Sequence, residues 1–469
     1  VLDGDRPLDL DFMRTIRPAS KHCVFVAHCD DDYHEAEQYK SLFVVSGFSV
    51  GPRADSRSEI ENAHFFILLV SDKSLASDRI QRELGLARAR QRETGGYRPL
   101  VIQVFARDAD WRKLRTAPTF PVCDFETGER TEFLSLNPAF DELTHPQARK
   151  ALIAFMRPTL SVARGDILDI TSFNETEVFK LYADLFPPNE RDDPVDIEHW
   201  VLDTDLGTVR SFNLPARGKI SYQLDSRYFI LSVANKAVGL GFLTYDYNAK
   251  LAYVNYVGVQ RCWREGQLAK ALFQEIVDVL ADLFPEYEAL ILEVERFDID
   301  AVDATIERLK AEPACFSSEQ KEEIRKFLRI RFYHKLGFFF FVDAATGRPL
   351  VCRSPCIDPS SDPTIWKDEE ADYWIMQLGR QPTAPPAADV AANWRRAIQS
   401  MYIEILLKSV AESRVIARQA EIAEKYWEYG NRVVDGTIAG TQGTRIELRQ
   451  FPDQTWYDRW RGLKISLPV

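Results

Sequence analysis

Long apolar runs are absent from this chain of 469 residues. A membrane-spanning helix needs about 18–20 consecutive apolar residues, whereas the apolar runs at 64–70 and 338–342 have the length of a β-strand. The first residues also lack the pattern of a secretory signal. We therefore expect a protein that has no contact with a membrane and is located in the cytoplasm.

Cysteine is scarce and irregularly placed, with seven residues spread through the chain. An odd number without a regular spacing does not form the framework of a disulfide-rich secreted domain. Cys352 and Cys356 form a C-x3-C pair, but no second pair of cysteines or histidines lies at the spacing of a zinc site. We therefore expect reduced thiols and no metal.

Positive charge is in deficit, since 59 Lys and Arg face 71 Asp and Glu for a formal net charge of −12. An acidic chain is not drawn to phosphates by its overall charge, so nucleic acid is not an expected partner. The apolar share of 45% is typical of globular proteins. The length exceeds one ordinary core and indicates several domains.

Strands and helices alternate in the first third of the chain. Apolar segments typical of buried strands lie at 23–28, 48–50, 64–71 and 99–105, with amphipathic helices expected at 32–46, 73–93 and 137–156. Strands of this kind separated by helices form a parallel sheet that is covered on both faces. We predict a small doubly wound parallel-sheet domain at 22–160, preceded by an N-terminal segment at 1–21.

The pattern changes after about residue 166. A strand and a helix are expected within 169–186, three strands within 228–259, a helix at 267–284, a strand at 289–295, helices within 298–335 and a closing strand at 372–379. This order indicates an α+β domain with a mixed sheet at 166–380. A Pro/Ala linker at 381–391 and a helical C-terminal extension at 392–469 complete an α/β multidomain protein.

Residues 252–272 are the most informative segment. An apolar strand leads into a turn rich in Arg and Gly, and this turn opens a helix. The N–H groups at the start of a helix have no partner within it, and the helix dipole favours an anion there. The segment is therefore suited to a pyrophosphate. Further on, residues 331–341 form a helix end, a glycine stop and another strand.

These two segments resemble the acyl-CoA-binding core of GNAT-type N-acyltransferases. In that family the fourth strand splays from its neighbour, and an Arg/Gln-x-x-Gly-x-Gly/Ala turn wraps the CoA pyrophosphate. Here Gln267 stands at the first glycine position, and Gly266 is displaced by one. The resemblance implies that acetyl-CoA or another acyl-CoA is bound by the strand and the turn, at Val257, Val259, Arg261, Arg264, Gly266, Gln267 and Ala269.

The resemblance also implies catalytic groups, with a small-molecule or protein amine as acceptor. Tyr333 would protonate the leaving thiolate, although a tyrosine that only packs in the core fits the same pattern. The fourth strand offers Asn255 but no Asp or Glu, so Glu293 on the fifth strand is the candidate base. Glu293 and Glu295 lie on the same face of this strand. Alternatively, this face is exposed to solvent and the two carboxylates only contribute to solubility.

Residues 22–156 resemble a TIR domain, through VFVAHCDDD, ENAHFFILLVSDKSLAS and the following DRIQREL. TIR families that hydrolyse NAD carry a glutamate in a Ser-x-Trp-Cys-x-x-Glu setting, and Glu83 matches it with Arg79 and Ile80 in place of Trp and Cys. The resemblance implies that NAD is a substrate and that Glu83 stabilises an oxocarbenium-like transition state. The pocket would lie at the carboxyl ends of the strands, near His28, Asp30, Arg53 and Ser71.

Other interpretations stay open. Glu83 lies among arginines and fits a surface ion pair one helical turn apart. TIR domains often serve only for self-association, so we expect a homo-oligomer that forms through TIR-like or C-terminal contacts. With Gln267 in the phosphate turn, the chain could instead be a non-catalytic sensor or scaffold whose GNAT-like domain binds a ligand or partner. A third interpretation keeps the acyltransferase as the active half. The family context implies a role in bacterial, including antiviral, defence or stress signalling.

Overall fold

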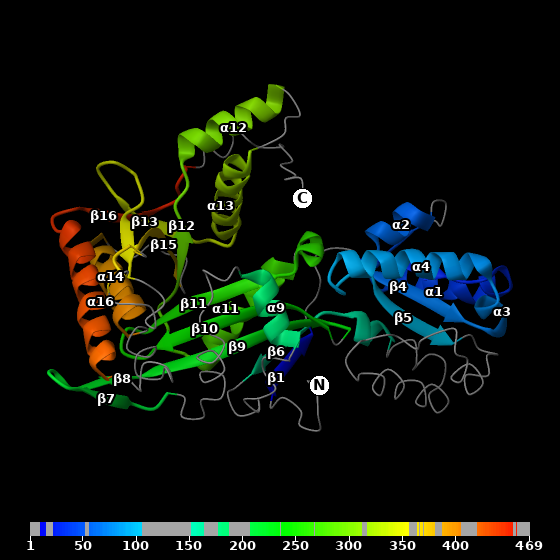
Figure 1. Ribbon diagram of the computed structural model, residues 1–469, viewed down its shortest axis with the longest axis horizontal. Helices are drawn as coiled ribbons and strands as arrows, with labels where there is room; N and C mark the ends of the chain where they lie inside the picture. Colours follow the sequence, from blue (N-terminus) through cyan, green and yellow to red (C-terminus); the bar gives the residue numbers. More distant parts are fainter. Residues whose placement is uncertain are drawn as a thin grey trace.

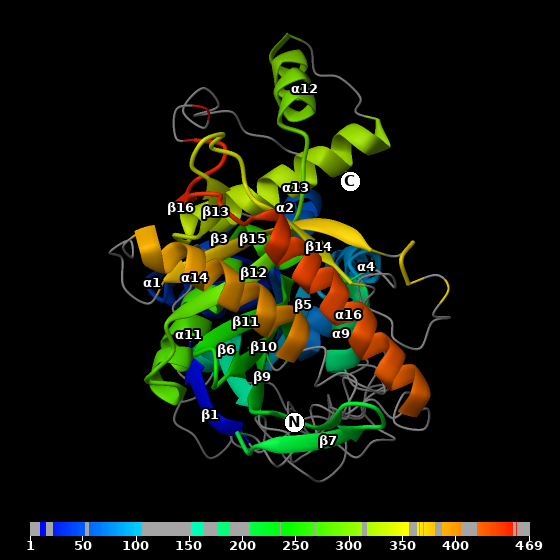
Figure 2. The same cartoon turned by 90° about the vertical axis from the view of Figure 1, so that its left-hand side faces the viewer.

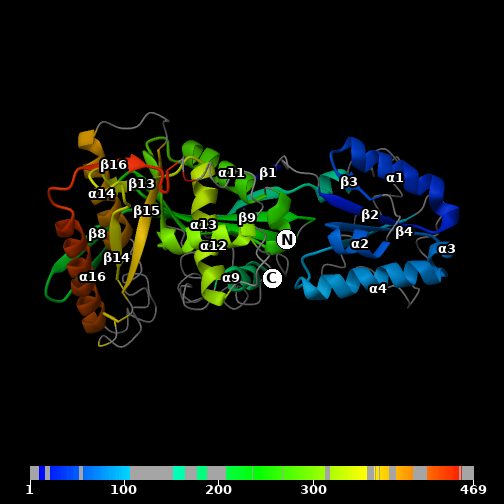
Figure 3. The ribbon, with the colours of Figure 1, turned by 90° about the horizontal axis from the view of Figure 1, so that it is seen from above.

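The computed structural model describes most of the chain in two main sheets. The small sheet lies at one end, the large sheet in the middle, and the helices of the C-terminal extension at the other end (Figures 1 and 3). The predicted α/β fold class is confirmed. The described residues are 10–15, 22–51, 56–105, 152–163, 177–186, 207–234, 236–266, 268–311, 317–355, 364, 366–368, 370–379, 387–404, 420–453 and 456.

The small sheet is parallel and doubly wound. Its order is β3 (Ser49–Val50), β2 (Cys23–Ala27), β4 (Phe65–Val70) and β5 (Leu100–Phe105). Every residue of β4 is buried, as expected for a strand covered on both faces. One face packs against α1 (Tyr33–Val45), and the other packs against α2 (Ser56–Asn62) and α4 (Asp78–Glu93), which follows the short α3 (Asp72–Leu75).

The large sheet is mixed and contains one parallel pair, β11–β12, among its described strand pairs. Its order is β1-β6-β9-β10-β11-β12-β15-β13-β16, with β14 on β15. The strands are β1 (Leu10–Thr15), β6 (Thr159–Ala163), β9 (Leu224–Val233), β10 (Lys236–Asp246), β11 (Leu251–Val259), β12 (Ala289–Glu295), β13 (Phe339–Asp343), β14 (Val351–Ser354), β15 (Ala371–Gly379) and β16 (Ile446–Arg449).

Helices cover both faces of the large sheet. α11 (Leu268–Leu283) and α13 (Ser318–Lys335) lie on one face, named here the α11 face. The opposite face, named the α9 face, carries α9 (Glu177–Leu185), α14 (Ala387–Ile398) and the π-helix η4 (Gln399–Glu404). Two further helices are α12 (Ile299–Ala311), which projects from the body, and α16 (Ala420–Gly440), beside the hairpin β7 (Arg210–Leu214) and β8 (Gly218–Tyr222) (Figures 1 and 2).

Strand pairing places several segments differently from the sequence analysis. β1 lies in the expected N-terminal segment yet pairs with β6, which itself spans the expected boundary at residue 160. α14 begins at Ala387, inside the expected linker, and β16 of the C-terminal extension pairs with β13. Short strands of this kind are fixed by their neighbours rather than by their own pattern. The expected helix at 137–156 and the strand expected before α9 lie largely outside the described residues.

Trp263 joins the two sheets. It lies in η3 (Arg261–Gly266), the 3-10 turn after β11, and is fully buried. Its ring contacts those of His22, His64 and Phe65, with centroid distances of 5.3, 5.2 and 5.8 Å. Its Nε1 donates a hydrogen bond to the Tyr97 carbonyl oxygen at 3.0 Å. The turn after β11 is therefore fixed on the small α/β domain.

Arg98 strengthens this junction. Its buried guanidinium donates to the carbonyl oxygens of Ala63 at 2.8 Å and of Cys262 in η3 at 3.0 Å. Burial and the charge of Arg98 lower the pKa of His22 to about 4 and that of His64 to about 2. Both imidazoles are consequently neutral at neutral pH.

Removal of the Trp263 ring should destabilise the protein. We expect Trp263→Ala to lower the free energy of unfolding by about 3–5 kcal/mol, as for other deletions of a large buried ring. Urea denaturation followed by circular dichroism measures this change. The control Val209→Ala, at a position that is 68% exposed, should change the free energy by less than about 0.5 kcal/mol. A loss below about 1 kcal/mol for Trp263→Ala would contradict the anchoring role.

Acidification should also weaken the junction. Because His22 and His64 have folded-state pKa values below the ordinary 6.5, the unfolded chain binds more protons in acid. The free energy of unfolding should therefore be highest above pH 6.5 and fall as the pH drops towards 4. His22→Leu removes an imidazole that has no hydrogen-bond partner among the described residues. Its free energy should depend less steeply on pH in this window, and equal slopes for variant and wild type would contradict a buried neutral His22.

Candidate functional site

β11 and β12 diverge after a short parallel segment. They pair where Leu251–Tyr253 lies beside Ala289–Ile291. Beyond this segment β11 stays paired with β10 as far as Val259, and β12 stays paired with β15 as far as Glu295. Paired strands lie about 4.8 Å apart, so the unpaired continuation of both strands opens a gap between them.

The exposure of β11 changes at the same point. Leu251 to Tyr253 are buried, whereas residues 254–258 are half-buried. The strand also has a bulge here, because Tyr256 pairs with Phe242 and Val254 with Leu243, which leaves Asn255 as the extra residue. A bulge bends a strand and interrupts its ladder. β11 therefore has a partly accessible edge along the gap.

The open end of the gap leads to a helix start. β11 continues directly into η3, and α11 begins at Leu268. The first N–H groups of a helix have no partner within it, so the start of a helix favours an anion. This strand, turn and helix bring together six of the seven predicted CoA-binding residues, namely Val257, Val259, Arg261, Arg264, Gly266 and Ala269. Gln267 lies outside the described residues.

Glu293, the candidate base, is half-buried on the α9 face of β12. Its Oε1 accepts a hydrogen bond of 2.6 Å from the hydroxyl of Tyr402 in η4. Burial raises the pKa of Glu293 to about 7, against the opposing effect of the Tyr402 hydrogen bond. A carboxyl group with this pKa suits proton transfer near neutral pH. The sequence indicated Glu293 but gave no sign of Tyr402, because the two residues are 109 positions apart.

Tyr333, the candidate acid, lies in α13 on the α11 face. Its ring packs against Phe273 and Phe338, with centroid distances of 5.7 and 5.6 Å. Burial raises the pKa of Tyr333, so the phenol keeps its proton at neutral pH. Glu293 and Tyr333 thus belong to opposite faces of the sheet. Side chains from both faces of a sheet can reach a single ligand that lies in a gap between two strands.

An apolar cleft lies next to the gap on the α9 face, between α9 and the sheet. Tyr256 of β11 reaches it and contacts the rings of Tyr182 and Phe186 at centroid distances of 5.1 and 4.9 Å. Its free space is about 20 Å³, which holds about one water molecule, and the lining residues are Val178, Tyr182, Tyr228, Phe229, Ile230, Leu240, Gly241, Phe242 and Tyr256.

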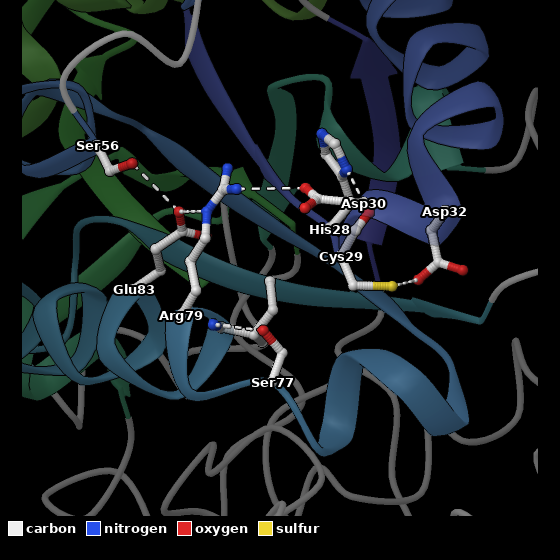
Figure 4. A network of polar contacts seen from close by, with 9 residues as sticks. His28, Cys29, Asp30, Asp32, Ser56, Ser77, Arg79 and Glu83 are labelled. Atoms are coloured by element: carbon white, nitrogen blue, oxygen red, sulfur yellow. Dashed lines mark hydrogen bonds and ion pairs between the residues drawn. The ribbon is translucent and has the colours of Figure 1, made fainter.

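Glu83, the candidate catalytic residue of the small domain, is only 3% exposed. Its Oε1 accepts hydrogen bonds from Ser56 Oγ at 3.1 Å and from Arg79 Nε at 3.3 Å (Figure 4). Arg79 also lies 3.4 Å from the exposed carboxylate of Asp30. The expected ion pair within the helix is therefore present between Arg79 and Glu83. However, the carboxylate of Glu83 is buried and does not lie on the surface.

The other predicted residues of the small domain follow the carboxyl ends of its strands. His28 comes directly after β2, is buried, and its Nδ1 lies 2.8 Å from the Cys29 carbonyl oxygen. Ser71 comes directly after β4 and caps α3, since its Oγ accepts from Ser74 N and donates to Asp32 Oδ2 at 2.6 Å. Ser71 thus has a structural role. Arg53 lies outside the described residues.

Neither a metal-binding cluster nor a membrane-spanning helix is found among the described residues. No group of three or more His, Cys, Asp and Glu side chains there could hold a metal ion. No helix in the same residues has the length and apolar character that crossing a bilayer requires.

No protein-family model matches the chain, and no curated protein matches it in sequence. Solved structures are similar to about half of it. A putative acetyltransferase from the GNAT family of Bacteroides thetaiotaomicron is 16% identical, with 48% of this chain and 89% of that chain covered and a TM-score of 0.27. The ribosomal-protein-S18-alanine N-acetyltransferase from Escherichia coli is 14% identical, with 47% and 93% covered and a TM-score of 0.25.

A third structure, a putative streptothricin acetyltransferase from Bacillus anthracis in complex with acetyl coenzyme A, is 14% identical. It covers 33% of this chain and 63% of its own, with a TM-score of 0.20. These similarities have low identity and low TM-scores. The function of this chain is therefore inferred from its own residues and topology.

Proposed function

We propose that the large-sheet domain transfers an acyl group from an acyl-CoA, such as acetyl-CoA, to an amine. The observation that carries this proposal is the gap between β11 and β12, with the start of α11 at its open end. An extended thioester arm would lie along the half-buried edge of β11, near Val257 and Val259. Its diphosphate would lie at the start of α11, where Arg261 adds positive charge. The side chain of Arg264 lies outside the described part of the structure.

In this proposal Glu293 takes a proton from the acceptor amine. The amine nitrogen then bonds to the thioester carbonyl carbon while the carbon–sulfur bond breaks, and Tyr333 gives its proton to the sulfur. The pKa of about 7 for Glu293 leaves a large ionised fraction at neutral pH, and the raised pKa of Tyr333 keeps it a proton donor. Glu293 then releases its proton to solvent, and the second proton, which the nitrogen loses as the amide forms, reprotonates Tyr333.

The acceptor would approach from the α9 face. The apolar cleft beside Tyr256 lies on this face, as does the Glu293 carboxylate. A hydrogen-bonded row follows the cleft, in which Thr244 Oγ1 lies 3.3 Å from Ser226 Oγ and donates to Asn255 Oδ1 at 3.0 Å. Ser226 and Thr244 are buried, so this row belongs to the protein interior, and the acceptor is proposed only as a small-molecule or protein amine.

Acetyl-CoA should stabilise the protein against heat. At about 100 times its dissociation constant, a ligand of the folded state raises the free energy of unfolding by about 2.7 kcal/mol. Differential scanning fluorimetry should show a higher Tm with acetyl-CoA and with free CoA, whereas acetate serves as the control and should leave Tm unchanged. An unchanged Tm at millimolar acetyl-CoA would contradict the proposal and favour the sensor or scaffold interpretation.

Loss of the base should slow the reaction more than it weakens binding. We expect Glu293→Gln to lower kcat by about 10²- to 10⁴-fold and to leave the Tm increase with acetyl-CoA intact. Glu295→Gln is the matched control, because Glu295 lies on the same strand but is paired with Arg329 at 3.0 Å. Release of free thiol in the presence of a panel of amines measures the rate. Wild-type kcat in Glu293→Gln would contradict its role as base.

A second function is favoured by the burial of Glu83. A buried carboxylate near the carboxyl ends of parallel strands could stabilise the positive charge that develops when nicotinamide leaves the ribose of NAD. In this proposal Glu83 faces the oxocarbenium-like centre, and Arg79 orients the carboxylate through its 3.3 Å contact. Self-association of the small domain remains a prediction from the TIR resemblance.

Glu83→Gln should abolish NAD loss and leave the fold intact. The control Glu93→Gln alters an exposed carboxylate of the same helix, paired with Arg90 at 3.0 Å, and should retain wild-type turnover. Chromatographic measurement of released nicotinamide distinguishes the variants. Turnover by the wild-type protein equal to that of buffer, at low and high protein concentration, would rule out the second function.

A further inference from the structure

The C-terminal extension contacts the large sheet at the point where β11 and β12 begin to diverge. The Tyr253 hydroxyl donates to the Ala397 carbonyl oxygen at 2.8 Å, and Ser400 Oγ donates to the buried carboxylate of Asp246. The third contact is the 2.6 Å hydrogen bond from Tyr402 to Glu293. Figure 2 shows α14 and α16 in front of this end of the sheet. The extension therefore packs against the site.

We propose that Tyr402 is a positioning residue for Glu293, so that the C-terminal extension supplies part of the active site. The inference rests on the proposed acyl-transfer function and adds a residue from outside the acyltransferase-like domain. The inference is based on the hydrogen bond between Tyr402, which is 5% exposed, and the Glu293 carboxylate.

The chemistry of the pair fixes the direction of the hydrogen bond. Burial and the charge of Glu293 raise the pKa of Tyr402 well above its ordinary value, so the hydroxyl keeps its proton and donates. The bond occupies Oε1, while Oε2 of Glu293 makes no hydrogen bond among the described residues. The carboxylate is thus held by one oxygen, and the other oxygen is available to take a proton from the amine.

The neighbouring charged groups are paired with one another. Glu295 lies 3.0 Å from Arg329 of α13. On β15, Asp372 lies 3.0 Å from Arg296 and 3.2 Å from Arg353 of β14. Cys352 of β14, beside the Tyr402 hydroxyl, stays a thiol because burial raises its pKa. Burial raises the pKa of Glu293, and the Tyr402 hydroxyl is the side-chain group that acts against this rise in the described structure.

The local backbone supports a functional reading of this contact. η4 is a π-helix, and such stretches are rare and frequently occur at functional sites. Here the π-helix buries Ser400 and Tyr402 against the sheet, and each donates to a carboxylate, Asp246 and Glu293 respectively. A hydrogen bond to the ionised form of a carboxyl group favours that form. Tyr402 thereby keeps Glu293 usable as a base near neutral pH.

The test compares Tyr402→Phe with Tyr253→Phe in the full chain. Both variants lose one buried hydroxyl that links the sheet to the C-terminal extension, but only Tyr402 contacts Glu293. Infrared spectra recorded at a series of pH values follow the carboxyl band of Glu293. This band is identified by its absence from the spectrum of Glu293→Gln. The pH dependence of kcat/KM for acyl transfer is measured on the same proteins, and their Tm values verify folding.

We expect the Glu293 band and the acid limb of kcat/KM to move upward by about one pH unit in Tyr402→Phe, as for the loss of a hydrogen bond to a charged group. Both should stay at the wild-type pH in Tyr253→Phe. An unmoved band in Tyr402→Phe, or an activity loss that is equal at every pH, would overturn the inference. A moved band in a protein that transfers no acyl group would instead overturn the acyl-transfer function.

Discussion

The divergence of β11 from β12 is the constraint on which the structure of the site depends. Each strand keeps a partner on its other side, β10 for β11 and β15 for β12, so the sheet stays continuous while its centre opens. Backbone groups along such a gap need partners, and an extended ligand can supply them. In the proposed reaction, Glu293 on one face and Tyr333 on the other would act on the same reacting centre in this gap.

Three separate parts of the chain hold this opening in place. The small α/β domain fixes the turn after β11 through Trp263 and Arg98. α13 brings Tyr333 to the α11 face, and the C-terminal extension brings Tyr402 to the α9 face. The small domain is thus in direct contact with the turn after β11, which is the proposed phosphate site.

The sequence predicted those elements whose own pattern determines them. The apolar runs that became β2 and β4 are buried on both faces, and β12 was placed at its observed bounds. The turn into α11 was evident from its residues alone. β1 and β6 were missed because pairing with neighbours, rather than local alternation, makes them strands. The contacts of Trp263 and Tyr402 join residues far apart in sequence, so no local pattern could indicate them.

The central claim is that the half-buried edge of β11 and the start of α11 bind an acyl-CoA. Hydrogen–deuterium exchange with and without a non-reactive thioether analogue of acetyl-CoA tests it most directly. The account predicts slower exchange of the amides at residues 254–258 and in the first turn of α11, with unchanged exchange in the strands of the small sheet. Unchanged exchange along β11 at saturating analogue would contradict it.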